Sequence, residues 1–97
     1  MWHPLMPWYV YVLTNAKGRR YVGATGRLPE IRLAEHNAGL SRWTRPHRPW
    51  QLSRWESFEI KRLALARERF LKSGSGRRLL DTLTPGWMQP DSQKSPD

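Results

Sequence analysis

Tyrosine, arginine, histidine and one glutamate are the residues of this chain that could carry out hydrolytic chemistry. Cutting a phosphodiester bond needs a group that activates the nucleophile, a cation that offsets developing charge and usually a metal ion held by carboxylate. Residues 1–83 contain only six acidic side chains, which argues against a two-metal carboxylate cluster. The sequence also lacks a P-loop glycine pattern, zinc-ligand spacing and a nucleophile elbow. These absences leave the tyrosines, arginines, histidines and Glu68 as candidates.

A strong positive charge predicts that the chain attracts a polyanion. Its 97 residues include 17 Lys+Arg and 8 Asp+Glu, which gives a net charge of +9 and an isoelectric point near 11.1. Thirteen of these cations are arginine, whose planar guanidinium binds phosphate through two hydrogen bonds and stacks on bases. With six tryptophans in addition, the composition favours nucleic acid over an anionic membrane as the partner.

The hydrophobic pattern predicts the elements that must position these residues. Residues 8–14 are aromatic and β-branched and predict a strand buried on both faces, which a turn over 15–18 joins to a second strand over 20–24. The pattern then predicts a helix over 29–38 ended by Gly39, a basic connection over 39–49, a third strand over 50–58, and helices over 60–72 and 75–83. The order β-β-α-β-α-α predicts an α+β fold, a small three-stranded antiparallel sheet flanked by helices.

The same pattern predicts which helical residues face the core. In the first helix these are Ile31, Ala34 and Ala38, while Arg32 and His36 lie four apart and project from one common side. The inward residues predicted for the two later helices are Ile60, Leu63, Ala64, Phe70, Leu71, Leu79, Leu80 and Leu83.

Composition also predicts the limits of the folded domain. Residues 8–83 form the predicted domain, residues 1–7 a short lead-in, and residues 84–97, which contain three prolines, a mostly disordered tail. No apolar run approaches the roughly 18 residues that a membrane span needs. The absence of cysteine and of a secretory signal pattern leads us to expect a cytoplasmic protein.

Five short motifs occur in an order that resembles a known nuclease family. Tyr9-Val10-Tyr11 and Tyr21-Val22-Gly23 resemble the paired motifs that name the GIY-YIG nucleases. The three motifs that follow them are Arg32-Leu33 with Glu35-His36-Asn37 on the first predicted helix, Ala66-Arg67-Glu68 on the second, and Lys72-Ser73-Gly74 after it. The resemblance covers about residues 8–83 and is strongest to small stand-alone bacterial members.

This resemblance implies a role for each matching residue. Tyr11 and Tyr21 would line the site, and one of them would help to deprotonate the attacking water. Arg32 would hold the scissile phosphate, and His36 would join proton transfer or contact a phosphate. Glu68 would ligate one divalent ion, Mg²⁺ or Mn²⁺.

Each of these roles has a structural alternative. Core packing alone explains an aromatic residue in a strand, although Gly23 inside a strand suggests that something approaches the backbone closely. A lone arginine on a helix usually faces solvent. The helical wheel places Glu68 beside the apolar stripe, where its partner would be either a metal ion or a cation such as Arg67 or Lys72.

Two basic regions are candidates for nucleic-acid binding. The connection before the third strand interleaves cations with aromatic residues and would track a phosphate backbone and stack unpaired bases; its candidates are Arg42, Trp43, Arg45, His47 and Arg48. The second region is Lys72, Arg77 and Arg78. The alternative is that Trp50 begins the third strand as a core residue and that the arginines only keep the loop soluble.

The sequence thus predicts a metal-dependent endonuclease that hydrolyses DNA, in repair or on branched or damaged substrates. One alternative is a non-catalytic nucleic-acid-binding module that retains the nuclease fold. A weaker one is an accessory domain recruited through an apolar patch near Trp2, Trp8 or Trp87.

Overall fold

The computed structural model describes residues 6–83. The tail predicted over 84–97 lies outside the described residues, as does most of the lead-in predicted over 1–7, including Trp2. Within residues 6–83, no helix is long and apolar enough to cross a bilayer.

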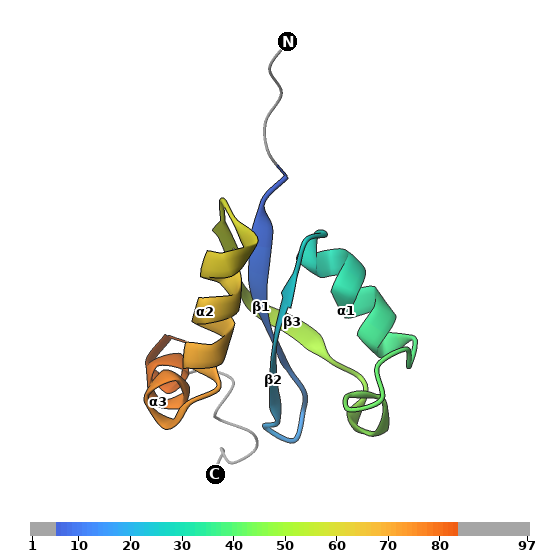
Figure 1. Ribbon diagram of the computed structural model, residues 1–97. Coiled ribbons are helices and arrows are strands. Elements are labelled where there is room, and N and C mark those ends of the chain that lie inside the picture. The colour runs from blue at the N-terminus through green and yellow to red at the C-terminus, as the bar shows by residue number, and fades with distance from the viewer. Residues whose placement is uncertain (1–5, 84–97) are drawn as a thin grey trace.

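Three antiparallel strands form one sheet, as predicted (Figure 1). They are β1 (Trp8–Thr14), β2 (Arg20–Thr25) and β3 (Gln51–Phe58), in the spatial order β2-β1-β3. The turn predicted over 15–18 joins β1 to β2, and Gly18 has a positive φ of 83° there. Because β1 is central, its residues from Val10 to Thr14 are all buried, which confirms the prediction of a strand covered on both faces.

Helices cover both faces of this sheet (Figure 1). On one face α1 (Pro29–Asn37) packs near Tyr11 and Leu13, and on the other α2 (Lys61–Leu71) and α3 (Gly74–Leu83) pack over Val10, Val12 and Val22. Alternate residues of β1 therefore belong to two separate cores, and the element order is the predicted β-β-α-β-α-α.

The predicted inward face of α1 is wrong. Ile31, Ala34 and Ala38 are all exposed, whereas His36 is completely buried and Leu33 packs against the core around Tyr11. The chemistry-bearing side of the helix faces the sheet, and this leaves the apolar stripe to solvent. Gly39 ends the helix as predicted, with φ of 84°.

The later helices bury fewer residues than predicted. Ala64, Leu71 and Leu80 are fully buried, and Leu79 packs against them. By contrast, Ile60, Leu63, Phe70 and Leu83 are exposed, each by 38% or more. These two helices cover a sheet of only three strands, so a single narrow stripe suffices. The junction between them is tight, because a Cβ at Gly76 would lie 2.0 Å from the carbonyl oxygen of Phe70.

Candidate active site

The hydroxyl of Tyr11 lies directly over Gly23 on the neighbouring strand. The two residues are paired across β1 and β2, and a Cβ built at Gly23 would lie 2.5 Å from the Tyr11 oxygen. A glycine is therefore required where the phenol crosses the strand, as its position inside a strand suggested. The glycine of the second motif fixes the place of the tyrosine of the first.

His36 connects this phenol to the loop that follows α1. Its Nε2 lies 2.9 Å from the Tyr11 hydroxyl, and its Nδ1 lies 2.6 Å from the Thr44 hydroxyl. His36 is 0% exposed and Thr44 is 1% exposed, so these three groups form a buried hydrogen-bonded chain. Both ring nitrogens have a partner, which fixes the plane of the imidazole.

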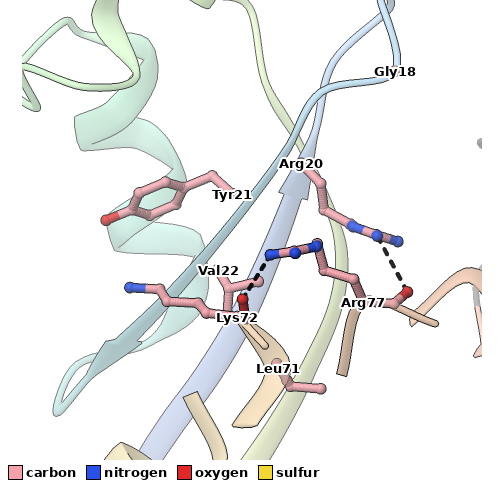
Figure 2. Close-up of a pocket in the computed structure, with 7 residues that line it drawn as sticks. All are labelled: Gly18, Arg20, Tyr21, Val22, Leu71, Lys72 and Arg77. Carbon is pink, nitrogen blue, oxygen red and sulfur yellow. Dashed lines mark hydrogen bonds between the residues drawn. The ribbon is translucent and has the colours of Figure 1, made fainter. Parts of the chain in front are cut away.

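Tyr21 extends the cluster toward the surface. Its ring centroid lies 4.9 Å from that of His36 and 6.3 Å from that of Tyr11. Figure 2 shows the Tyr21 ring directed away from the edge strand β2, with its hydroxyl at the far end. This phenol is half-buried, whereas that of Tyr11 is enclosed.

Arg32 lies at the mouth of the cluster. One of its terminal nitrogens is 3.5 Å from His36 Nε2, and the guanidinium is ion-paired with Glu35. Glu35 also accepts from Arg27 at 2.8 Å, so one carboxylate is shared between two arginines. That sharing leaves positive charge beside the Tyr11 and His36 hydrogen bond.

Burial and this charge decide the protonation of the cluster. Burial raises the pKa of the Tyr11 phenol above its ordinary value of 10.0, and the Arg32 guanidinium offsets only part of the rise. Burial, followed by the charge of Arg32, lowers the pKa of His36. Both groups are therefore neutral at pH 7. Arg32 has only donors and faces Nε2, so Nε2 is the acceptor: Tyr11 donates to it, and Nδ1–H donates to Thr44.

Glu68 approaches from the opposite side of the sheet. It lies on α2, its side chain is 22% exposed, and it accepts a hydrogen bond from Lys72 Nζ at 2.8 Å. After burial and the neighbouring Tyr21 phenol, the negative charge of Glu68 also contributes to the raised pKa of Tyr11. Of the cations considered from sequence, the partner is Lys72, since Arg67 pairs instead with Glu56 on β3 at 2.8 Å.

A divalent ion at Glu68 would have a single protein carboxylate. Among residues 6–83 there is no group of three or more His, Cys, Asp or Glu side chains arranged to hold a metal. Mg²⁺ is commonly held by one or two carboxylates, with waters and substrate phosphates completing its octahedron. The donor set therefore fits an ion that binds together with a phosphate, and does not fit a protein cage.

A basic pocket of about 370 Å³ adjoins the cluster along β2 (Figure 2). Its cations come from three elements: Arg20 from β2, Lys72 from the end of α2 and Arg77 from α3. Arg77 donates to the Lys72 carbonyl oxygen at 2.7 Å, and Arg20 is ion-paired with Asp81 at 3.0 Å. Because Tyr21 also lines this pocket, its cations lie next to the phenol cluster.

The residues that form this cluster lie within a segment that matches a known protein family. The model of the GIY-YIG catalytic domain matches residues 7–80, which include every strand and helix that carries the cluster. The chain belongs to the GIY-YIG family.

Relatives of this GIY-YIG domain share the name UPF0213. The UPF0213 protein of Natronomonas pharaonis is 42% identical over 66 residues, which is 67% of this chain and 76% of the relative. That of Pediococcus acidilactici is 40% identical over 78 residues, or 77% of this chain and 79% of the relative. The NMR structure of the UPF0213 protein of Bacillus halodurans is 27% identical with a TM-score of 0.51, and the match covers 95% of this chain and 100% of that one.

In this GIY-YIG domain, all three residues of the Glu35-His36-Asn37 motif have partners. Glu35 holds Arg32, and His36 holds Tyr11. Asn37 accepts from the Trp50 backbone N–H at 2.7 Å and donates to the Trp50 carbonyl oxygen at 3.0 Å. Asn37 therefore closes the base of the loop that contains Thr44.

Some residues of the basic loop are held by hydrogen bonds, and others are exposed to solvent. Arg48 donates to the Arg45 carbonyl oxygen at 2.8 Å, and the His47 carbonyl oxygen accepts from Asn15. Trp43 is 80% exposed and Arg42 is exposed. Trp50 is a core residue, as its structural alternative predicted. Of the second basic group, Lys72 and Arg77 line the pocket, while Arg78 donates to Ser75 on α3.

Sequence reasoning missed Thr44, Asn37 and Arg20 as site residues. Thr44 stands inside a basic loop and Arg20 at the start of a strand, and neither position shows which way the side chain points. Asn37 belongs to the Glu35-His36-Asn37 motif, but the sequence does not indicate its contact with the Trp50 backbone. Only the closure of the loop over α1 brings Thr44 to His36.

Proposed function

We propose that this protein is a metal-dependent endonuclease that hydrolyses phosphodiester bonds in DNA. The observation that carries the proposal is the Tyr11–His36 hydrogen bond beside the Arg32 guanidinium, with Tyr21 and Glu68 nearby. Membership of the GIY-YIG family and the excess of positive charge support it. These groups would supply a proton acceptor and a phosphate-binding cation and, from α2, a carboxylate whose charge acts on Tyr11.

Arg32 binds the scissile phosphate in this account. Its side chain is 26% exposed and already sits at the mouth of the cluster, paired with a carboxylate that Arg27 shares. A guanidinium forms two parallel hydrogen bonds to phosphate oxygens and offsets the charge that grows on them during attack. Glu35 keeps the guanidinium in place before the substrate arrives.

Tyr11 and His36 move the proton of the attacking water. The Tyr11 phenol accepts that proton as it passes its own to His36 Nε2, the ring nitrogen that already accepts its hydrogen bond because Nδ1–H donates to Thr44. Water then adds to phosphorus in line with the departing oxygen, which leaves and takes a proton from solvent water, and His36 afterwards returns its extra proton to solvent. Tyr21, the more exposed phenol, orients the water or a phosphate oxygen at the pocket side.

Glu68 is the residue that would hold the divalent ion, Mg²⁺ or Mn²⁺. When bound, the ion neutralises charge on the phosphate and on the leaving oxygen. To hold the ion, the Glu68 carboxylate would have to release Lys72, and an ion pair whose side chains are 22% and 51% exposed is weak enough to allow this. Lys72 is then available to a phosphate in the basic pocket.

Cleavage assays test this function. The full-length protein is incubated with nicked, flapped and branched DNA in Mg²⁺ or Mn²⁺, alongside Tyr21→Phe and Glu68→Ala. We expect metal-dependent products that both substitutions abolish. Folded wild-type protein that cuts none of these substrates would overturn the proposal.

A second candidate, a non-catalytic nucleic-acid-binding module, draws support from the Glu68–Lys72 ion pair. This pair satisfies the carboxylate without a metal ion. In that case DNA binding would survive both EDTA and Glu68→Ala, would weaken steeply with salt and would never accompany strand scission.

A further inference from the structure

Trp43 is the most exposed of the large hydrophobic residues described between residues 6 and 83. It is 80% exposed, although transfer of a tryptophan ring from water to an apolar environment is favourable. The other tryptophans described are more covered: Trp50 is a core residue, Trp8 packs against the core of α2, and Trp55 lies edge-on to Tyr9 at a centroid distance of 6.0 Å. Packing of this domain therefore gives no reason for the ring at position 43.

The backbone on both sides of Trp43 is nevertheless fixed. The Arg45 N–H donates to the Ser41 carbonyl oxygen at 2.9 Å, which closes a turn around the tryptophan. The next residue, Thr44, is buried, and its carbonyl oxygen accepts from the Trp50 indole at 2.9 Å. A ring presented from a rigid backbone loses little further entropy when a ligand covers it.

This turn lies next to the catalytic cluster. Thr44 touches His36, and consecutive Cα atoms are about 3.8 Å apart, so Trp43 is anchored one residue from the proton path. Arg42 and Arg45 flank it and are exposed. The turn therefore carries an exposed indole with an exposed arginine before it and another after it in the sequence, beside the place where a phosphate would be cut.

An unpaired nucleobase is the ligand that matches this combination. A free base has an open face to stack on an indole, whereas a base within a duplex is already stacked on both faces. A duplex backbone would need the arginines alone and would leave the tryptophan in water. We propose that Trp43 stacks an unpaired base next to the cleaved phosphate, so that the substrate class is DNA with single-stranded nucleotides at the cleavage point; this inference rests on the proposed function.

DNA-binding measurements on the full-length protein test the inference. Affinities for oligo-dT, a flapped duplex and a blunt duplex are measured in EDTA by fluorescence anisotropy, for wild type, Trp43→Ala and Trp43→Phe. Trp55→Ala is the matched control, because Trp55 is 51% exposed on β3. We expect Trp43→Ala to weaken binding of oligo-dT and the flap by about 5- to 150-fold, with little effect on the blunt duplex. Trp43→Phe should keep most of the affinity, and Trp55→Ala nearly all of it.

Two outcomes would overturn the inference. In one, Trp43→Ala weakens binding to all three DNAs equally; in the other, it changes none of them, and the exposed ring serves another partner such as a protein. Cleavage separates this inference from the proposed function. Stacking that depends on Trp43 without any scission would refute the nuclease alone, whereas equal cleavage of the flapped duplex by wild type and Trp43→Ala would refute the stacking role alone.

Discussion

The buried chain from Tyr11 through His36 to Thr44 gives each side chain a single orientation and protonation state. Tyrosine is a poor base at neutral pH because it is protonated there. Burial makes the Tyr11 phenolate rarer still by raising the pKa of the phenol. In the proposed mechanism the neutral imidazole would compensate, because it would accept the phenolic proton at the moment of attack. Proton transfer is therefore a property of the pair.

Thr44 positions this imidazole, and its hydroxyl can be removed with little change in shape. We expect Thr44→Val to lower the rate constant for DNA cleavage by roughly tenfold or more, which is part of the about 10²–10⁴-fold that a positioned proton-transfer group supplies. DNA affinity should be unchanged, and Thr44→Ser should restore activity. Imidazole ¹⁵N chemical shifts would report the altered tautomer. Normal shifts and normal cleavage in Thr44→Val would show that the hydroxyl has no such role.

The lowered pKa of His36 predicts how stability depends on pH. In the unfolded chain the imidazole titrates near pH 6.5, whereas in the folded protein it resists protonation to lower pH. The unfolded state thus binds more protons, and the free energy of unfolding should fall as the pH drops below about 6.5 toward the folded pKa. Urea unfolding at pH 7.5 and at more acidic values, in wild type and His36→Gln, measures this. A slope that is the same in both proteins would contradict the assignment, and His47→Gln is the control substitution.

Among the elements, α1 explains both the success and the failure of sequence reasoning. The strands and helices appeared nearly where turn residues and β-branched runs predicted them, because those signals are local. The predicted core face of α1 was wrong, because Ile31 and Ala34 form an apolar stripe that faces solvent, whereas Arg32 and His36 face the sheet. The motif spacing already placed Arg32 and His36 on a common side, and only the site decides that this side points inward.

The crossing of β1 and β2 at Gly23 is an equally specific requirement of the strands. We expect Gly23→Ala to displace the Tyr11 hydroxyl, since the new Cβ would lie 2.5 Å from it, and to reduce cleavage by about 100-fold, as a shift of about 1 Å in an active site does. The control is Gly74→Ala, where the nearest neighbour, an Arg78 nitrogen, is 3.7 Å from the added Cβ. Circular dichroism and cleavage rates are compared for both. A fully active Gly23→Ala protein would show that the position of Tyr11 is not critical.

Over the whole molecule, the site forms where segments far apart in sequence meet at the edge strand β2. Arg20 of β2, Lys72 just after α2 and Arg77 of α3 line one pocket, and Thr44 in the loop after α1 reaches His36. Sequence motifs predicted Tyr11, Tyr21, Arg32, His36 and Glu68 as a set, and the first four lie together with the charge of Glu68 in range. The residues that support them have no spacing signal, because their contacts arise only from the tertiary packing.

Single-turnover cleavage by wild type and Tyr11→Phe tests the central claim most directly, because this substitution removes one oxygen and keeps the ring. A labelled flap DNA is mixed with excess protein in Mg²⁺, and affinity is measured separately in EDTA. We predict that wild type cuts the DNA and that Tyr11→Phe binds equally well but cuts at least about 100-fold more slowly. Equal rates for the two folded proteins, or no cutting by wild type, would contradict the account.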